Sequence, residues 1–133
     1  MTASRRKAFK FIALLGKPGS GKGTQIKLLI DFLKNKNGQE SVYASPGNEY
    51  RKLIQANNYT GSLVEGPLSS GELLPGFLTD AIVANLLISF LTPEKNLMTD
   101  GYPREPEQSI SFEEMMKFYK RENIKIINIE ISK

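Results

Sequence analysis

The segment with the clearest chemistry is the glycine-rich run GKPGSGKGT at residues 16–24, which follows an apolar stretch at residues 11–15. Glycines let the backbone curl so that successive N–H groups point inward, and a following helix adds its positive end. Such a cradle binds phosphate, and Lys22 can neutralise the outer phosphates of a nucleoside triphosphate. Gly23 stands where serine or threonine is usual, so the Thr24 hydroxyl comes one residue late to orient phosphates or hydrated Mg²⁺. The run predicts a nucleotide-binding loop.

Two residues further along the chain could act on the same phosphates. Asp100 closes an apolar strand pattern, and a carboxylate there can reach the metal shell beside a phosphate loop. Aspartate also begins turns, so a purely structural role stays open. Arg104 follows Pro103 on a turn, where a guanidinium could grip phosphate with two hydrogen bonds. Taken alone, it fits an ordinary surface arginine equally well.

Strand and helix patterns alternate along the chain. Continuous or short β-rich runs predict strands at residues 9–15, 41–44, 96–99 and 124–131. Helical spacing predicts helices at residues 22–37, after the turn at 46–48, at 75–91, and over Ile110, Met115, Phe118 and Tyr119. Residues 57–71 are rich in Asn, Gly, Ser and Pro, which predicts a mobile connection. The alternation predicts a three-layer α/β domain, like P-loop nucleoside triphosphate hydrolases, with a parallel sheet and the ligand at its carboxyl edge.

Composition narrows the chemistry. The chain has 133 residues, 40% of them hydrophobic and 24% charged, without cysteine or histidine. Disulfides, thiol nucleophiles, thiolate-bound zinc and imidazole bases are therefore excluded, and a reducing cytoplasmic location fits. The net charge of +4 is concentrated in residues 1–30, so we expect no nucleic-acid partner. Asp80 and Asn85 interrupt the most apolar stretch, residues 76–91, which favours a buried helix over a membrane span. We expect a monomer.

Four segments occur in order: residues 16–25, 45–51, 71–75, and 100–104 with Gln108. Together they resemble the adenylate kinases over nearly all of residues 10–131. The resemblance implies phosphoryl transfer from Mg²⁺-bound ATP to a nucleoside monophosphate, with AMP as the expected acceptor. It also implies a P-loop core domain at residues 1–44 and 75–133, with a monophosphate-binding insert at 45–74. We expect that these residues do not include the separate lid of the family.

The resemblance implies a role for each matching residue. Lys22 would neutralise the transferring phosphate, and Arg51 and Arg104 would hold the monophosphate, which makes these three the catalytic set. Asp100 would hold water on Mg²⁺, with Thr24 as a second metal contact. The ATP phosphates would lie in a cradle made by Gly19, Ser20, Gly21, Lys22, Gly23 and Thr24. The monophosphate site would further include Gly101, with Leu73 and Leu74 bordering the base and Gln108 hydrogen-bonding its edge.

Two departures from the family pattern limit these expectations. Pro46 stands where the family usually has a threonine that touches the acceptor base, so base selectivity is open. The last predicted strand runs into the C-terminus, and no arginine follows Arg121, whereas the family has a lid and further arginines there. We therefore expect that more chain follows Lys133. A missing arginine can cost about 10³ to 10⁵ in rate, so these residues alone should bind nucleotide weakly and transfer phosphate slowly.

Two other functions stay open at this stage. The chain could be a nucleotide-binding module without turnover, or a kinase of UMP or CMP. A GTPase switch is disfavoured because residues 35–38, Asn-Lys-Asn-Gly, lack the carboxylate of a guanine-reading Asn-Lys-x-Asp segment.

Overall fold

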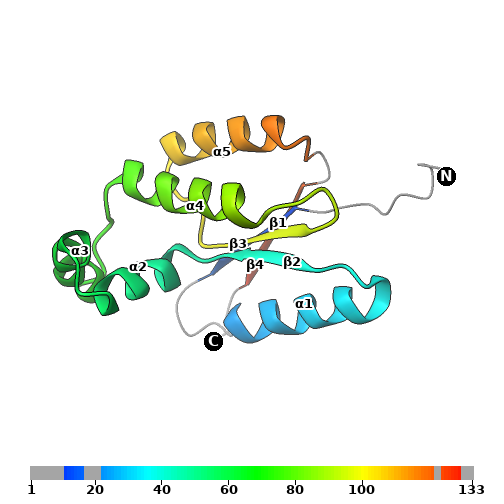
Figure 1. Ribbon diagram of the computed structural model, residues 1–133, viewed down its shortest axis with the longest axis horizontal. Helices are drawn as coiled ribbons and strands as arrows, with labels where there is room; N and C mark the ends of the chain where they lie inside the picture. The colour runs from blue at the N-terminus through cyan, green and yellow to red at the C-terminus, as the bar shows by residue number, and fades with distance from the viewer. Residues whose placement is uncertain (1–10, 17–21, 122–123, 130–133) are drawn as a thin grey trace.

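The computed structural model describes residues 11–16, 22–121 and 124–129 (Figure 1). Their centre is a four-stranded sheet in the order β2-β3-β1-β4, in which every neighbouring pair is parallel. The strands are β1 (Phe11–Gly16), β2 (Ser41–Ala44), β3 (Asn96–Asp100) and β4 (Ile124–Ile129). The predicted parallel α/β sheet is confirmed, while residues 9–10 of the first predicted strand and 130–131 of the last lie outside the described residues.

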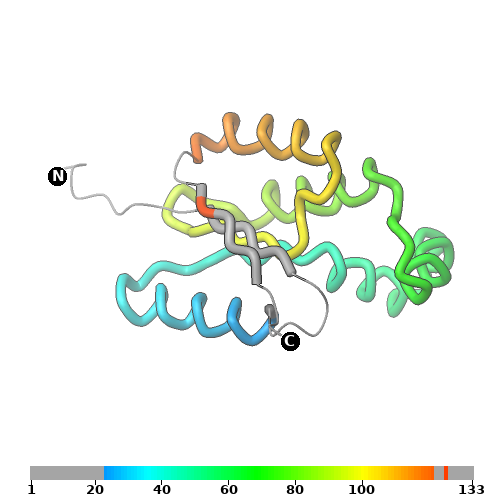
Figure 2. The backbone as a smooth tube through the Cα atoms, turned by 180° about the vertical axis from the view of Figure 1, so that it is seen from behind, coloured from blue at the N-terminus to red at the C-terminus, as the bar shows by residue number. Residues whose placement is uncertain are grey.

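Helices cover both faces of this sheet. In chain order they are α1 (Lys22–Asn37), α2 (Pro46–Gln55), α3 (Tyr59–Ser69), α4 (Gly76–Phe90) and α5 (Pro106–Phe118). Figure 1 shows α4 and α5 on one face and α1 on the other, and Figure 2 shows the same layers from behind. The helices α2 and α3 extend beyond one end of the sheet (Figure 1). This arrangement is the predicted three-layer architecture.

Two apolar clusters hold the layers together. The larger lies between the sheet and α4 and α5, and the smaller consists of Ile26, Leu33 and Met98 between the sheet and α1. Leu97 and Met98 are neighbours on β3 and belong to different clusters, because successive side chains of a strand point to opposite faces. A sheet buried on both faces requires such a continuous apolar strand. Within the described residues, no helix has both the length and the hydrophobicity needed to cross a bilayer.

The prediction of a mobile connection at residues 57–71 is wrong, because most of this segment is helix α3. The Asn58 side chain accepts a hydrogen bond from the Gly61 backbone N–H at 2.7 Å and caps the helix. Gly61 and Val64 are buried where α3 packs against α2. The weak helix formers of this segment are therefore ordered by a cap and by tertiary packing.

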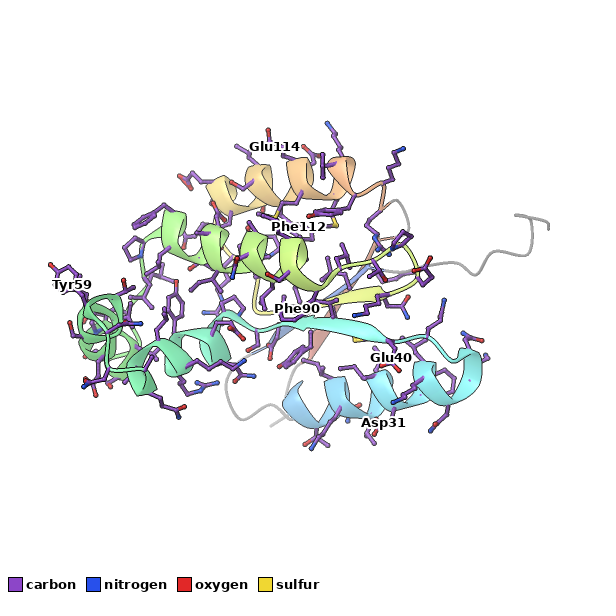
Figure 3. All side chains as sticks on the ribbon, viewed as in Figure 1. Asp31, Glu40, Tyr59, Phe90, Phe112 and Glu114 are labelled. Atoms are coloured by element: carbon purple, nitrogen blue, oxygen red, sulfur yellow. The ribbon has the colours of Figure 1, made fainter. Side chains whose placement is uncertain are left out.

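The predicted apolar face of α5 also needs correction. Its buried residues are Gln108, Phe112 and Met116, and Figure 3 shows Phe112 between α5 and α4. Ile110 and Phe118, which the helical spacing placed on the apolar face, are 70% and 77% exposed. Met115 and Tyr119 pack against the larger core cluster, as the helical spacing predicted. The buried residues of α5 follow a 4-residue repeat from Gln108, and the polar residue in that row concealed it.

Candidate functional site

Three neighbouring strands end at one edge of the sheet and bring the predicted site segments together. β3 lies between β2 and β1, with Ala44 paired to Thr99 and Leu14 paired to Asp100. Because the strands are parallel, the chain leaves all three ends on the same side. The segments that follow are residues 45–51 after β2, 100–104 after β3, and the glycine-rich run after β1.

Part of the predicted phosphate loop falls outside the described residues, namely Gly19, Ser20 and Gly21. Lys22 begins α1, and Gly23 and Thr24 lie exposed in its first turn. The backbone N–H groups of a first helical turn have no partner within the helix, and the helix dipole favours an anion there. The described start of α1 is thus suited to a phosphate group.

Asp100 is held at this edge by Tyr43, a residue that the sequence did not single out. The Tyr43 hydroxyl donates a hydrogen bond to Asp100 Oδ2 at 2.5 Å, across the β2–β3 pair. Burial, followed by this bond and the Asp100 charge, raises the pKa of Tyr43 to about 12. The Ser45 hydroxyl and the Arg51 charge act in the opposite direction and lower the pKa of Tyr43 by a smaller amount. The feature of the sequence that could have pointed to Tyr43 is its place near the carboxyl end of a short strand, at the edge where the site was predicted.

Arg51 is exposed in the second turn of α2. The helix begins with Ser45 as its cap, whose side chain accepts from the Asn48 N–H at 3.3 Å, and with Pro46 in its first turn. The Arg51 guanidinium donates a hydrogen bond to the Asn48 side chain, which folds it back over the start of the helix. There it approaches Gly47, where a side-chain carbon would lie 3.5 Å from its Nη2.

Arg104 is the second predicted phosphate ligand, and it is exposed. Its guanidinium packs over Gly101, where a side-chain carbon would lie 2.9 Å from Nη2. Gly101 also has a φ of 73°, which other residues adopt with difficulty. Position 101 therefore favours glycine through its backbone angle, and a side chain there would displace the Arg104 guanidinium from its present place.

Gln108 is buried and serves the backbone of the arginine segment. Its Oε1 accepts the N–H groups of Arg104 at 2.7 Å and of Glu105 at 3.2 Å. This side chain therefore satisfies N–H groups at the start of α5. Only its amide N–H₂ group is left for the base contact that the resemblance implied.

Leu73 and Leu74 lie between α3 and α4, in the connection that follows the packed pair α2–α3. Leu73 is 65% exposed and Leu74 is partly buried. Because Leu73 is exposed and does not belong to either core cluster, its side chain is free to cover an apolar surface of a ligand.

Two hydrogen bonds involve tyrosines that neighbour the predicted arginines in the chain, and the sequence predicted neither. Tyr50 Oη and Thr79 Oγ1 share a hydrogen bond of 2.5 Å, and the Tyr102 hydroxyl donates to Asp80 Oδ1 at 2.6 Å. Burial is the main cause that raises the pKa of both tyrosines. Each tyrosine stands within two residues of a predicted phosphate-binding arginine.

The donor chemistry at this edge suits Mg²⁺. Asp100 offers a carboxylate and Thr24 a hydroxyl, which are the hard oxygen ligands that this ion prefers. Among the residues that the structure describes, no group of three or more His, Cys, Asp or Glu could hold a metal ion. Mg²⁺ commonly needs only one or two protein carboxylates because substrate phosphates and water complete its shell. The two residues therefore fit the ion.

Comparison with known proteins identifies the family that this sequence matches. Residues 14–133 match the family model for adenylate kinase. A protein of Rickettsia rickettsii is 31% identical over 121 residues, which cover 91% of this chain and 52% of that protein. A protein of Thermosipho melanesiensis is 37% identical over 121 residues, which cover 91% of this chain and 53% of that protein. A protein of Thermococcus kodakarensis is 41% identical over 103 residues, which cover 77% of this chain and 42% of that protein. All three are named adenylate kinase, and the chain spans about half the length of these relatives.

Proposed function

Because this chain belongs to the adenylate kinase family, we propose that it supports phosphoryl transfer from Mg²⁺-bound ATP to a nucleoside monophosphate, with AMP as the expected acceptor. The membership implied by the four sequence segments is confirmed. The proposal is supported most directly by the shared sheet edge, where the start of α1, Arg51, Asp100 and Arg104 all follow neighbouring parallel strands. We further propose that residues 45–74, which contain α2 and α3, form the monophosphate-binding insert.

The reaction needs no covalent intermediate on the protein. An oxygen of the acceptor phosphate attacks the γ-phosphorus of ATP, the bond from that phosphorus to the bridging oxygen breaks, and two diphosphates result. The work of the protein is to align the two phosphates and to offset negative charge in the transition state. Lys22 would contact the transferring group, while Arg51 and Arg104 would hold the acceptor phosphate with charge-assisted hydrogen bonds.

Bound Mg²⁺ would neutralise charge on the phosphates of ATP. Asp100 would orient water on the ion, and the Thr24 hydroxyl would reach the same shell. The hydrogen bond from Tyr43 restricts the rotation of the Asp100 carboxylate and so contributes to its orientation.

A UMP or CMP kinase is the second candidate, and Pro46 favours it. This residue is buried in the first turn of α2 and has neither a hydroxyl nor a backbone N–H. A base contact that depends on a threonine hydroxyl is therefore missing at this position.

The test measures diphosphate formation and nucleotide binding in the purified chain. ATP is supplied with AMP, CMP, UMP or GMP, and Lys22→Ala is compared with Lys27→Ala, a change at an exposed lysine of α1. We expect AMP to be the best acceptor and Lys22→Ala to lower the rate by about 10²-fold or more, because charge stabilisation in the transition state is lost. Lys27→Ala should behave like the wild type.

Two results would contradict the proposal. Absence of any calorimetric signal with ATP in millimolar Mg²⁺ would exclude nucleotide binding at this edge. Binding without diphosphate formation would instead favour a nucleotide-binding module that lacks turnover.

A further inference from the structure

Two adjacent residues in α4 contact both segments that carry the phosphate-binding arginines. We propose that Thr79 and Asp80 are positioning residues that set the separation of Arg51 and Arg104, and with it the affinity for the phosphate of a nucleoside monophosphate. This inference rests on the function proposed above. It concerns residues that make no ligand contact themselves.

Thr79 holds the segment of Arg51. Its Oγ1 shares the 2.5 Å hydrogen bond with the Tyr50 hydroxyl, and Tyr50 directly precedes Arg51 in α2. Both partners are buried, with Tyr50 4% and Thr79 7% exposed. A hydrogen bond between two buried hydroxyls is directional, and each partner would lose its bond if the helices shifted. The contact therefore ties α2 to the beginning of α4.

Asp80 holds the segment of Arg104. Its Oδ1 accepts the Tyr102 hydroxyl at 2.6 Å, and its Oδ2 accepts the Ser111 hydroxyl of α5 at 2.9 Å. Tyr102 is fully buried two residues before Arg104, and its carbonyl oxygen accepts the Thr99 hydroxyl at 2.7 Å. The turn that carries Arg104 is thus fixed to β3, α4 and α5 together.

The hydrogen bonds of Tyr50 and Tyr102 to α4 are not needed to fill space in the core. Phenylalanine at positions 50 or 102 would fill nearly the same volume, yet each tyrosine hydroxyl reaches a partner in the first turn or so of α4. The same helix contributes Val83 and Leu87 to the apolar core farther along. Thr79 and Asp80 are adjacent in α4, so the two contacts lie next to each other on this helix. α4 therefore couples the two arginine segments at one point.

The separation of the two arginines matters because charge-assisted hydrogen bonds to phosphate need distances of about 2.7–2.9 Å. A shift of about 1 Å in either segment would remove contacts from one guanidinium. ATP would be held at the start of α1, on the other side of the sheet from α4, so its binding should respond much less.

The experiment measures dissociation constants for AMP and for ATP by calorimetry, together with melting temperatures. Thr79→Val removes the hydroxyl at constant shape, Thr79→Ser retains it, and Tyr102→Phe removes the second contact. We expect Thr79→Val and Tyr102→Phe each to weaken AMP binding by about tenfold and ATP binding by less than about twofold. Thr79→Ser should recover most of the AMP affinity.

Tyr59→Phe serves as the matched control because Tyr59 is 78% exposed at the outer side of α3 (Figure 3). It should bind both nucleotides like the wild type. If the wild type binds AMP and both test variants match Tyr59→Phe, the positioning role is overturned while the proposed function stands. Equal weakening of AMP and ATP binding, in step with a lower melting temperature, would also overturn it. If the wild type binds no monophosphate, the proposed function fails and the positioning role fails with it.

Discussion

The crossing of α2 and α3 gives the sharpest prediction, because it depends on a single hydrogen atom at Gly61. A methyl group there would place its carbon 2.1 Å from the carbonyl oxygen of Leu53 and 2.7 Å from the carbonyl carbon. Both atoms belong to the α2 backbone, so no side-chain rotation can relieve the overlap. Gly61→Ala should therefore push α3 away from α2 and disturb the helix that carries Arg51.

The expected magnitude follows from two opposing effects. Replacing glycine by alanine inside a helix stabilises by about 0.5–1 kcal/mol. Overpacking at a rigid contact costs about 1–3 kcal/mol, and a backbone contact this short belongs at the upper end. With an overpacking cost near 3 kcal/mol and a helical gain of about 0.5–1 kcal/mol, we expect Gly61→Ala to lower the free energy of unfolding by about 2–2.5 kcal/mol. Gly66→Ala, in the same helix with open space around it, should change the free energy of unfolding by less than about 0.5 kcal/mol, because Pro67 disfavours the helical conformation of a preceding residue that has a Cβ and so offsets the gain of replacing glycine.

Urea unfolding followed by circular dichroism checks both variants, since the midpoint shifts with stability when the slope is unchanged. AMP affinity, measured in the same samples, should fall for Gly61→Ala and stay constant for Gly66→Ala. The reasoning is refuted if Gly61→Ala unfolds at or above the wild-type midpoint. That result would mean that α3 does not cross α2 as closely as the structure has it.

Two further predictions concern buried polar groups. The folded-state pKa of Tyr43, about 12, exceeds the ordinary 10.0, so the contribution of this tyrosine to stability is complete below pH 10 and is lost as pH rises toward 12. In urea unfolding measured from pH 10 to 12, the free energy of unfolding should therefore fall less steeply with pH for Tyr43→Phe than for the wild type. An equal slope for the two proteins would contradict the raised pKa of Tyr43. Arg121 donates to the carbonyl oxygens of Lys95 and Thr92, both at 2.7 Å. Arg121→Met should therefore lower the free energy of unfolding by about 2–4 kcal/mol, whereas Lys117→Met at an exposed position should change it by less than about 0.5 kcal/mol. Equal urea midpoints for the two variants would refute the role of Arg121.

The parts of the fold that the sequence predicted are those with strong local signals. A continuous apolar run predicted β1, a short β-rich run predicted β3, and helical spacing predicted α1, which is followed by Gly38. Gly38 has a φ of 69°, a conformation that suits a helix C-terminus and that glycine adopts readily. Burial determines which residues occur in the two strands, and turn geometry determines the glycine after α1.

The helix α3 was missed because its signals are tertiary. Glycine at position 61 indicates a loop when read locally, yet the close crossing with α2 is what requires it. Asn58 was a usable signal, since asparagine is a preferred helix cap. The two buried contacts of Thr79 and Asp80 were hidden for a similar reason, because their partners lie 29 and 22 residues away in the chain.

The described structure gives phosphate recognition more support than base recognition. Arg51 and Arg104 are each placed by a capped helix or a fixed turn, and hydrogen bonds hold the segments that contain them. On the base side, Pro46 offers no hydroxyl, and the Gln108 oxygen is engaged by backbone N–H groups. A site that hydrogen-bonds its ligand can reject wrong ligands by about 10⁴-fold, whereas an apolar pocket achieves only about 10²-fold. The energy of monophosphate binding should therefore lie mainly in its phosphate, so that acceptors with different bases differ less in affinity than a monophosphate differs from its nucleoside.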